Sequence, residues 1–148
     1  MIGLLQRVTE ANVTVGGNSV GRIGPGLLVL IGVVQGDADS DATRLAERLA
    51  TYRVFPDDAD RMNRSLVDTG GALLAVPQFT LAADTGRGRR PSFGRAAAPD
   101  EGKRLFEVFC DAVRAMGIPV ETGEFGADMQ VQLINDGPVT FWLSTRND

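Results

Sequence analysis

Hydrophobic and polar residues alternate at the start of the chain in the manner of a β-sheet. Between Ile2 and Val15, polar side chains separate many of the apolar ones, which is typical of a strand with one buried face. Residues 16–19 read Gly-Gly-Asn-Ser and predict a turn. The stretch 20–34 is interrupted by a Gly-Pro-Gly at 24–26 and continues at 27–34 as an apolar run suited to a central, buried strand. We therefore expect this part of the chain to form a β meander.

Two later segments have the spacing of amphipathic helices. In the first, Ser40 is placed to cap a helix that ends before Pro56. The second helix has Pro99 in its first turn, and Gly117 and Pro119 are its stop signals. Apolar residues recur at helical spacing in both segments, at Ala42, Leu45, Ala46, Leu49 and Ala50 and at Leu105, Phe106, Phe109, Val113 and Met116.

The remaining apolar segments predict further strands. Residues 72–81 read as one strand, in which Pro77 marks an edge or a bulge. Three more strands are expected at 120–122, 129–134 and 139–143. About six or seven strands with two main helices and no strict β-α-β alternation predict an α+β fold with a mostly antiparallel or mixed sheet, open or barrel-like. Because no linker or internal repeat divides the chain, we expect residues 1–148 to form a single domain.

The composition removes several kinds of catalytic site. The chain has no histidine, which excludes Ser-His-Asp and Cys-His nucleophile systems and the usual zinc sites. The single cysteine, Cys110, lies in the second predicted helix and is expected to be a small, buried or half-buried thiol. No secretory segment and no apolar run of membrane-spanning length is present, so we expect a soluble, cytoplasmic protein with no membrane partner.

The charge distribution is uneven. A net charge of −4 and a pI near 4.8 argue against a protein that binds DNA or RNA through bulk electrostatics, and no DNA partner is expected. A loop rich in Gly, Pro and Ser nevertheless carries four arginines, Arg87, Arg89, Arg90 and Arg95. No acidic residue lies between the first and the last of them. This loop is either a solvated surface or a local phosphate contact.

Two short segments stand where strands meet loops. Gln78-Phe79-Thr80 ends an apolar strand, where polar side chains and backbone N–H groups become available to a ligand, although the same pattern suits an ordinary edge strand. Residues 135–140 read Asn-Asp-Gly-Pro-Val-Thr between two predicted strands. They form either a simple hairpin turn or, if the bond between Gly137 and Pro138 is cis, a rigid pair of carbonyls suited to hold an amino group.

Together these segments resemble the D-aminoacyl-tRNA deacylases, also called D-tyrosyl-tRNA deacylases. The family signatures are Ser-Gln-Phe-Thr-Leu and Asn-X-Gly-Pro-Val-Thr; residues 135–140 match the second, and residues 77–81 match the first except at Pro77, where the family commonly has serine. The resemblance extends in order over nearly the whole chain, through residues 6–8, 61–63, 88–93 and 123–129.

The resemblance implies an activity and an assembly. Family members hydrolyse the ester between a D-amino acid, or glycine mischarged on tRNA-Ala, and the 3′-terminal adenosine of tRNA, and they act as homodimers. By analogy Gly137 and Pro138, with Asn135, Val139 and Thr140 beside them, would reach into the partner's pocket as a clamp that holds the substrate amino group and excludes L-amino acids.

The resemblance also implies roles for the other matching residues. The backbone N–H groups of Phe79 and Thr80 would contact the oxyanion or carbonyl, and Gln78 and the Thr80 hydroxyl would orient the adenosine, the ester or a water. The remaining expectations are that Arg7 braces the Gly-Pro loop, that Phe125 and Met129 line or support the pocket, and that Arg87, Arg89 and Arg90 contact tRNA. No metal and no cofactor is expected, since an aminoacyl ester is already activated and the ribose 2′-OH can assist.

Two other functions fit parts of the sequence. The first is a noncatalytic module that binds the 3′ end of tRNA through the arginine loop and an adenosine pocket, although one Trp and one Tyr are few for a stacking surface. The second is a metal-dependent hydrolase built on Asp57, Asp58, Asp60 and Asp128.

Overall fold

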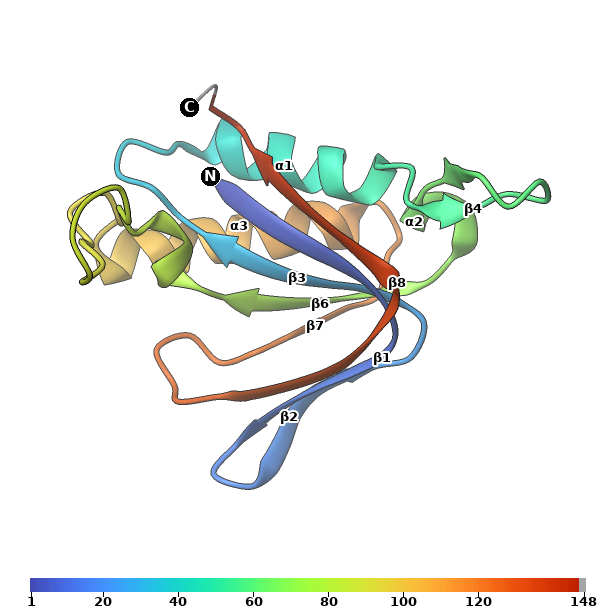
Figure 1. The fold of residues 1–148 in the computed structure, drawn as a ribbon, viewed down its shortest axis with the longest axis horizontal. Helices are drawn as coiled ribbons and strands as arrows, with labels where there is room; N and C mark the ends of the chain where they lie inside the picture. Colours follow the sequence, from blue (N-terminus) through green and yellow to red (C-terminus); the bar gives the residue numbers. More distant parts are fainter. Residues whose placement is uncertain (147–148) are drawn as a thin grey trace.

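The computed structural model describes residues 1–146. Its main feature is a six-stranded mixed sheet of order β2-β1-β3-β6-β7, in which β8 also pairs with β1. The strands are β1 (Ile2–Val15), β2 (Asn18–Ile23), β3 (Gly26–Gly32), β6 (Ala72–Pro77), β7 (Val120–Thr122) and β8 (Gln130–Ser144). Figure 1 shows this strongly bent sheet, with the two long helices on one side of it. The α+β class expected from the sequence is confirmed.

The long strand β1 organises the sheet, and the predicted meander is wrong. Residues 2–8 of β1 pair with β3, and residues 11–15 pair with β2, so both neighbours share one edge of β1. The other edge of β1 pairs with β8 over nearly its whole length. A strand as long as β1 offers room for two short partners on one edge, which the local sequence pattern does not reveal.

The sheet curls toward a barrel. Strands β3, β6 and β7 run parallel, whereas β1 is antiparallel to its three neighbours. The curl brings β2 against β7, where a Cβ added at Gly21 would lie 2.6 Å from the carbonyl oxygen of Thr122. Both faces of β3 are therefore buried: Leu27, Val29 and Ile31 face the helices, and Leu28 packs inside the curl. This explains its continuous apolar run.

Two long helices, α1 (Asp39–Thr51) and α3 (Pro99–Ala115), cover one face of the sheet. Their buried positions match the predicted apolar faces, and Pro99 starts α3 as expected. The cap predicted at Ser40 is wrong, because the N-cap of α1 is Ala38, whose N–H donates to the Asp41 carboxylate at 2.8 Å. Within residues 1–146, no helix is long and apolar enough to cross a membrane.

Short elements occupy the connections. They are β4 (Phe55–Pro56), β5 (Met62–Arg64), the one-turn helix α2 (Leu66–Thr69) and the 3₁₀ helix η1 (Phe79–Ala82). The predicted strand 72–81 therefore ends at Pro77, where the chain turns into η1. The two strands predicted at 129–134 and 139–143 are one strand, β8. The chain does not turn back between them; the register of its pairing with β1 shifts near Asn135 instead.

Candidate functional site

The turn after β6 exposes Phe79 and Thr80 and leaves Gln78 half-buried. The Gln78 N–H donates to the Ile31 carbonyl at 2.7 Å, which fixes the start of the turn against β3. The Gln78 side-chain amide donates to the Thr80 hydroxyl. Among residues 1–146, no group accepts a hydrogen bond from the N–H of Phe79 or Thr80, as expected for the first residues of a helix. The turn thus offers two unused N–H donors.

An apolar cavity of about 260 Å³ opens beside this turn. Its walls come from the end of β3, the turn, the start of α3 and the loop before β8, with Ile31, Val33, Pro77, Gln78, Phe79, Ala97, Pro99, Gly102, Phe106, Phe125 and Gly126 as lining residues. The Phe125 ring packs over Gly102, where an added Cβ would just reach contact with Phe125 Cζ at 3.4 Å. Its aromatic and small lining residues suit an apolar group bound beside Phe79.

A second cavity, of about 240 Å³, also borders this turn. It shares Pro77, Gln78, Phe79 and Gly126 with the first and adds Val76, Ala127, Met129 and Val131. The structure therefore places Phe125 in one cavity wall and Met129 in the other. Between the cavities, Phe79 is 58% exposed and its ring contacts that of Phe93, with 5.2 Å between centroids.

The Gly-Pro segment forms an exposed bulge on β8. The bond between Gly137 and Pro138 is cis, and both residues are exposed. The Asn135 side chain spans the bulge: its Oδ1 accepts from the Val139 N–H at 2.8 Å, and its Nδ2 donates to the Thr140 hydroxyl at 3.0 Å. Because these bonds use both ends of the amide, Asn135 holds the bulge rather than facing outward.

Arg7 supports the bulge from β1. Its Nε donates to the Asp136 carbonyl at 2.8 Å, and one terminal nitrogen donates to the Val54 carbonyl at 2.7 Å. The side chain is only 12% exposed and lies 3.5 Å from the Asp136 carboxylate. Arg7 therefore ties the bulge to the segment that follows α1.

The turn and the bulge do not meet within one chain. Residues 135–140 line neither cavity that contains Gln78 and Phe79. The two ends of this segment instead pair with β1, Asn135 with Val8 and Thr140 with Gln6. The structure thus brings the predicted site residues together in two separate groups.

Strand β8 also carries a surface that the sequence reasoning missed. Ile134 is 53% exposed and Trp142 is 50% exposed, and Val131 and Phe141 are exposed on the same strand. Within residues 1–146, β8 pairs only with β1, so its other edge is unpaired. An unpaired edge strand with exposed large apolar residues is typical of an interaction surface. The neighbouring large apolar residues Phe141 and Trp142 were the available signal.

The arginine loop stands beside the turn. An antiparallel bridge between Asp84 and Ser92 closes it, and Arg87, Arg89 and Arg90 are all exposed. Among residues 1–146, these three guanidinium groups make no hydrogen bond or ion pair. They are available to an anionic ligand near the Phe79–Phe93 contact.

Two of the four acids considered as metal ligands, Asp57 and Asp58, have structural partners. The Asp57 carboxylate accepts from the N–H groups of Ala59 and Arg61, and the Arg61 bond is the main cause of its lowered pKa. Asp58 pairs with Arg64 at 2.9 Å. In the described part of the chain, no three acidic, histidine or cysteine side chains gather as a metal site would require.

Cys110 lies buried between α3 and the sheet. Burial raises the pKa of its thiol to about 12, so the thiolate is scarce at neutral pH. This agrees with the expectation of a structural thiol.

Comparison with known proteins identifies the family. Residues 4–144 match the family described as D-Tyr-tRNA(Tyr) deacylase. The chain belongs to this family. A protein of Alkalilimnicola ehrlichii named D-aminoacyl-tRNA deacylase is 62% identical over 146 residues, covering 99% of this chain and 97% of that protein. One of Idiomarina loihiensis with the same name is 59% identical over 143 residues, covering 97% and 99%. The chain therefore belongs to a family of enzymes, as its sequence predicts.

Solved structures agree with this assignment. A structure titled c-Myc DNA Unwinding Element Binding Protein superposes with a TM-score of 0.93 at 33% identity and covers 99% of both chains. A second, titled as a probable eukaryotic D-amino acid tRNA deacylase, has a TM-score of 0.83 at 22% identity and covers 96% of this chain and 97% of that one. The D-Tyr-tRNA(Tyr) deacylase family fold is thus present over nearly the whole chain.

Proposed function

We propose that this protein is a D-aminoacyl-tRNA deacylase, with residues 1–148 as one catalytic domain. The observation that carries the proposal is the turn at residues 78–80, which has two unused N–H donors and whose residues Gln78 and Phe79 line both cavities, in a chain of this family. Water attacks the ester carbonyl carbon, the bond to the ribose 3′ oxygen breaks, and free D-amino acid and tRNA are released.

The turn supplies stabilisation rather than a nucleophile. The N–H groups of Phe79 and Thr80 donate to the carbonyl oxygen as negative charge develops on it. The Thr80 hydroxyl accepts from the Gln78 amide, so the two side chains are held as a pair that orients the ester or the attacking water. No histidine is available as a base, and the neighbouring ribose 2′-OH assists the attack. The mechanism uses no cofactor.

Each of the two cavities binds a different part of the substrate. The apolar cavity lined by Phe125 takes the 3′-terminal adenine, a flat ring that matches its aromatic and small-residue walls. The cavity lined by Met129 takes the aminoacyl group. The tRNA phosphates contact Arg87, Arg89 and Arg90, and RNA rather than DNA is the polymer bound. We place the protein in the cytoplasm, where aminoacyl-tRNA is made and used.

A homodimer completes the site. The bulge lines neither cavity of its own chain, yet it is held rigidly by Arg7 and Asn135 and stands next to the exposed apolar residues of β8. Docking two β8 surfaces buries Ile134 and Trp142 and carries Gly137 and Pro138 of one subunit to the turn of the other. Their carbonyls hold the substrate amino group, and the side chain of an L-amino acid collides with the clamp.

This chirality filter admits glycine. A glycyl ester has no side chain to collide, so glycyl-tRNA mischarged on tRNA-Ala is also a substrate. The D-amino acid side chain points away from the clamp, and one site therefore accepts D-esters and glycyl esters and spares L-esters.

Subunit complementation tests the proposal. One subunit carries Gln78→Ala with Thr80→Ala, and the other carries Gly137→Ala. Each homodimer should keep at most about a tenth of wild-type activity, whereas a statistical mixture of co-expressed subunits should recover about a quarter of it, because half of the dimers are heterodimers and each of these has one intact turn facing one intact clamp. No recovery in verified heterodimers would contradict the cross-subunit site.

The alternative is a noncatalytic module that binds the 3′ end of tRNA. The same cavities and arginine loop would serve it. Binding of a 3′-adenosine analogue with no hydrolysis of any aminoacyl ester would favour this module over the enzyme.

A further inference from the structure

The rings of Phe79 and Phe93 form an exposed aromatic pair, and the proposed mechanism assigns no role to the Phe93 ring. Phe93 is 42% exposed, and its ring contacts that of Phe79 with 5.2 Å between the centroids and 54° between the ring planes. Two exposed rings in contact form an apolar surface of the kind that binds a ligand or a partner. The aromatic pair is therefore the starting point for a further binding subsite.

The closure of the arginine loop holds Phe93 next to Phe79. The Asp84 N–H donates to the Ser92 carbonyl at 2.7 Å, and the Ser92 N–H donates back to the Asp84 carbonyl at 3.0 Å. This bridge returns the chain to the end of η1, so the residue after Ser92 meets the first residue of η1. The contact between the rings thus follows from the backbone of the loop.

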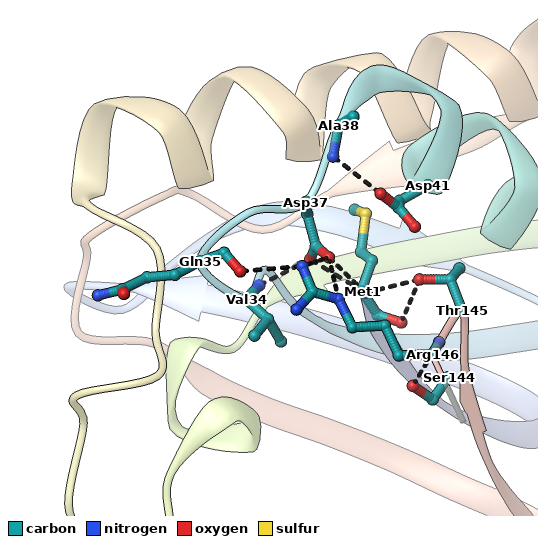
Figure 2. A network of polar contacts seen from close by, with 9 residues as sticks. All are labelled: Met1, Val34, Gln35, Asp37, Ala38, Asp41, Ser144, Thr145 and Arg146. Atoms are coloured by element: carbon teal, nitrogen blue, oxygen red, sulfur yellow. Dashed lines mark hydrogen bonds and ion pairs between the residues drawn. The ribbon is translucent and has the colours of Figure 1, made fainter. Parts of the chain in front are cut away.

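The far end of the loop is anchored to the body of the fold. The Gln35 N–H donates to the Arg95 carbonyl at 2.9 Å. Figure 2 shows how Gln35 is held in turn: Arg146 donates to its carbonyl at 2.9 Å and pairs with the buried Asp37. Phe93 therefore lies between two fixed points of the chain, the bridge before it and this bond after it. A ring that is already fixed loses little freedom when it binds a ligand.

The loop that carries Phe93 also carries positive charge. Its three exposed guanidinium groups, at residues 87, 89 and 90, are available to an anion, whereas the Asp84 carboxylate accepts from the Gly86 N–H at 2.9 Å inside the loop. Aromatic rings beside arginines fit a single-stranded nucleic acid, because its bases stack on rings and its phosphates bind cations. An apolar peptide would leave the guanidinium groups without anionic partners.

We propose that Phe93, supported by Phe79, stacks against the base of the nucleotide that precedes the terminal adenosine of tRNA. The proposal rests on the proposed function, because it takes the adenine to lie in the cavity lined by Phe125. Phe79 lines that cavity and contacts Phe93, so the cavity and the Phe93 ring adjoin. The strand that leaves the cavity passes Phe93 and then brings its phosphates to the loop arginines. The subsite adds affinity for a chain of nucleotides and thereby favours tRNA esters over esters of free adenosine.

Two substrates with the same ester separate this subsite from the turn. They are D-aminoacyl-tRNA and the D-aminoacyl ester of adenosine, which has no second base. Phe93→Leu keeps an apolar side chain without a ring, and it should raise the KM for the tRNA ester about five- to fiftyfold more than the KM for the adenosine ester. Phe93→Tyr, which restores a ring, should return the KM for the tRNA ester to within about twofold of wild type. An equal rise for both esters would overturn the proposal.

Binding of uncharged RNA tests the subsite independently of hydrolysis. The probes are the trinucleotide cytidine-cytidine-adenosine and the same trinucleotide with an abasic middle position. Phe93→Leu should weaken binding of the first about five- to fiftyfold and binding of the second by less than about twofold, because the abasic probe has no base to lose. This pattern in a protein that hydrolyses no ester would refute the proposed function and support the subsite. Hydrolysis of the D-ester together with equal weakening for both probes would refute the subsite alone.

The salt dependence of tRNA binding separates stacking from a disturbed loop. Stacking releases no counterions, so Phe93→Leu should leave the slope of log affinity against log salt within about 0.3 of the wild-type value. Val20→Ala is the matched control, since Val20 is also 42% exposed but lies on β2 and lines neither cavity of the site. It should change neither the KM ratio nor the binding of either probe. Wild-type affinity in Phe93→Leu, or a fall in slope as large as that caused by removing the three loop arginines, would overturn the proposal.

Discussion

Replacing Arg7 with leucine should weaken both the fold and the chirality filter. Arg7 donates to two backbone carbonyls, that of Asp136 at 2.8 Å and that of Val54 at 2.7 Å, and its side chain is mostly buried. Hydrogen bonds to a charged donor contribute about 1.5–3 kcal/mol each, so Arg7→Leu should cost about 3–6 kcal/mol. For a chain of this length that loss corresponds to a Tm lower by roughly 6–24 °C.

The loss should also appear in selectivity. Without Arg7 the Asp136 carbonyl has no charged donor and the bulge can shift, so the rate on D-aminoacyl-tRNA should fall by about tenfold or more while the ratio of D to L hydrolysis falls too. The assay measures hydrolysis of matched D- and L-esters of one tRNA at a temperature at which the variant is folded, together with thermal unfolding.

A second arginine provides the control. Arg48 donates to the Ser144 carbonyl at 3.0 Å and ties α1 to β8 away from the bulge. Arg48→Leu should lower the Tm but leave the ratio of D to L hydrolysis unchanged. An Arg7→Leu protein with wild-type rate and selectivity, or a loss of selectivity equal in both variants, would refute the bracing role.

Four further predictions follow from the same structure. Gln78→Ala and Thr80→Ala should each lower the hydrolysis rate without a change in circular dichroism, since Thr80 is exposed and Gln78 is only half-buried; unchanged rates for both would remove these two side chains from the mechanism. Gly137→Ala should lower the rate by at least about tenfold, because its Cβ would overlap the Val139 backbone nitrogen and lie 2.6 Å from Val139 Cγ2; wild-type turnover would show that the bulge tolerates a shift. Cys110, with its pKa raised to about 12, should react with a thiol reagent at pH 8 about a thousandfold more slowly in the native protein than in urea, and equal rates would contradict its burial. Replacing the three loop arginines at 87, 89 and 90 with alanine should reduce the slope of log affinity for tRNA against log salt by up to about 2, whereas an unchanged slope would place the phosphates elsewhere.

Much of the fold could be predicted because hydrophobic periodicity is local. The faces of α1 and α3 and the burial of β3 followed from spacing alone. The partners of β1 could not be predicted. Whether β2 and β3 both pair with one edge of β1 depends on the tertiary arrangement of the strands, which the local pattern does not contain. The N-cap predicted at Ser40 is wrong because α1 is capped two residues earlier, at Ala38, whose N–H donates to the Asp41 carboxylate. The end of strand β6 at Pro77 had one signal in the sequence, the proline itself, which has no backbone N–H to donate to a neighbouring strand.

The candidate site was predicted by resemblance more than by pattern. Alone, residues 135–140 fit a hairpin turn, and only the tertiary pairing of β8 with β1 through this region shows a bulge. The roles of Asn135 and Arg7 in holding that bulge required coordinates, because their partners are backbone carbonyls and N–H groups.

Hydrolysis of matched D- and L-aminoacyl esters of the same tRNA by the purified protein tests the central claim most directly. The measurement includes a chelator and a Gln78→Ala, Thr80→Ala control. Rapid loss of the D-ester alone, abolished in the control, is the result that this account predicts. Intact D-ester in the presence of bound tRNA, or equal hydrolysis of both esters, would contradict it.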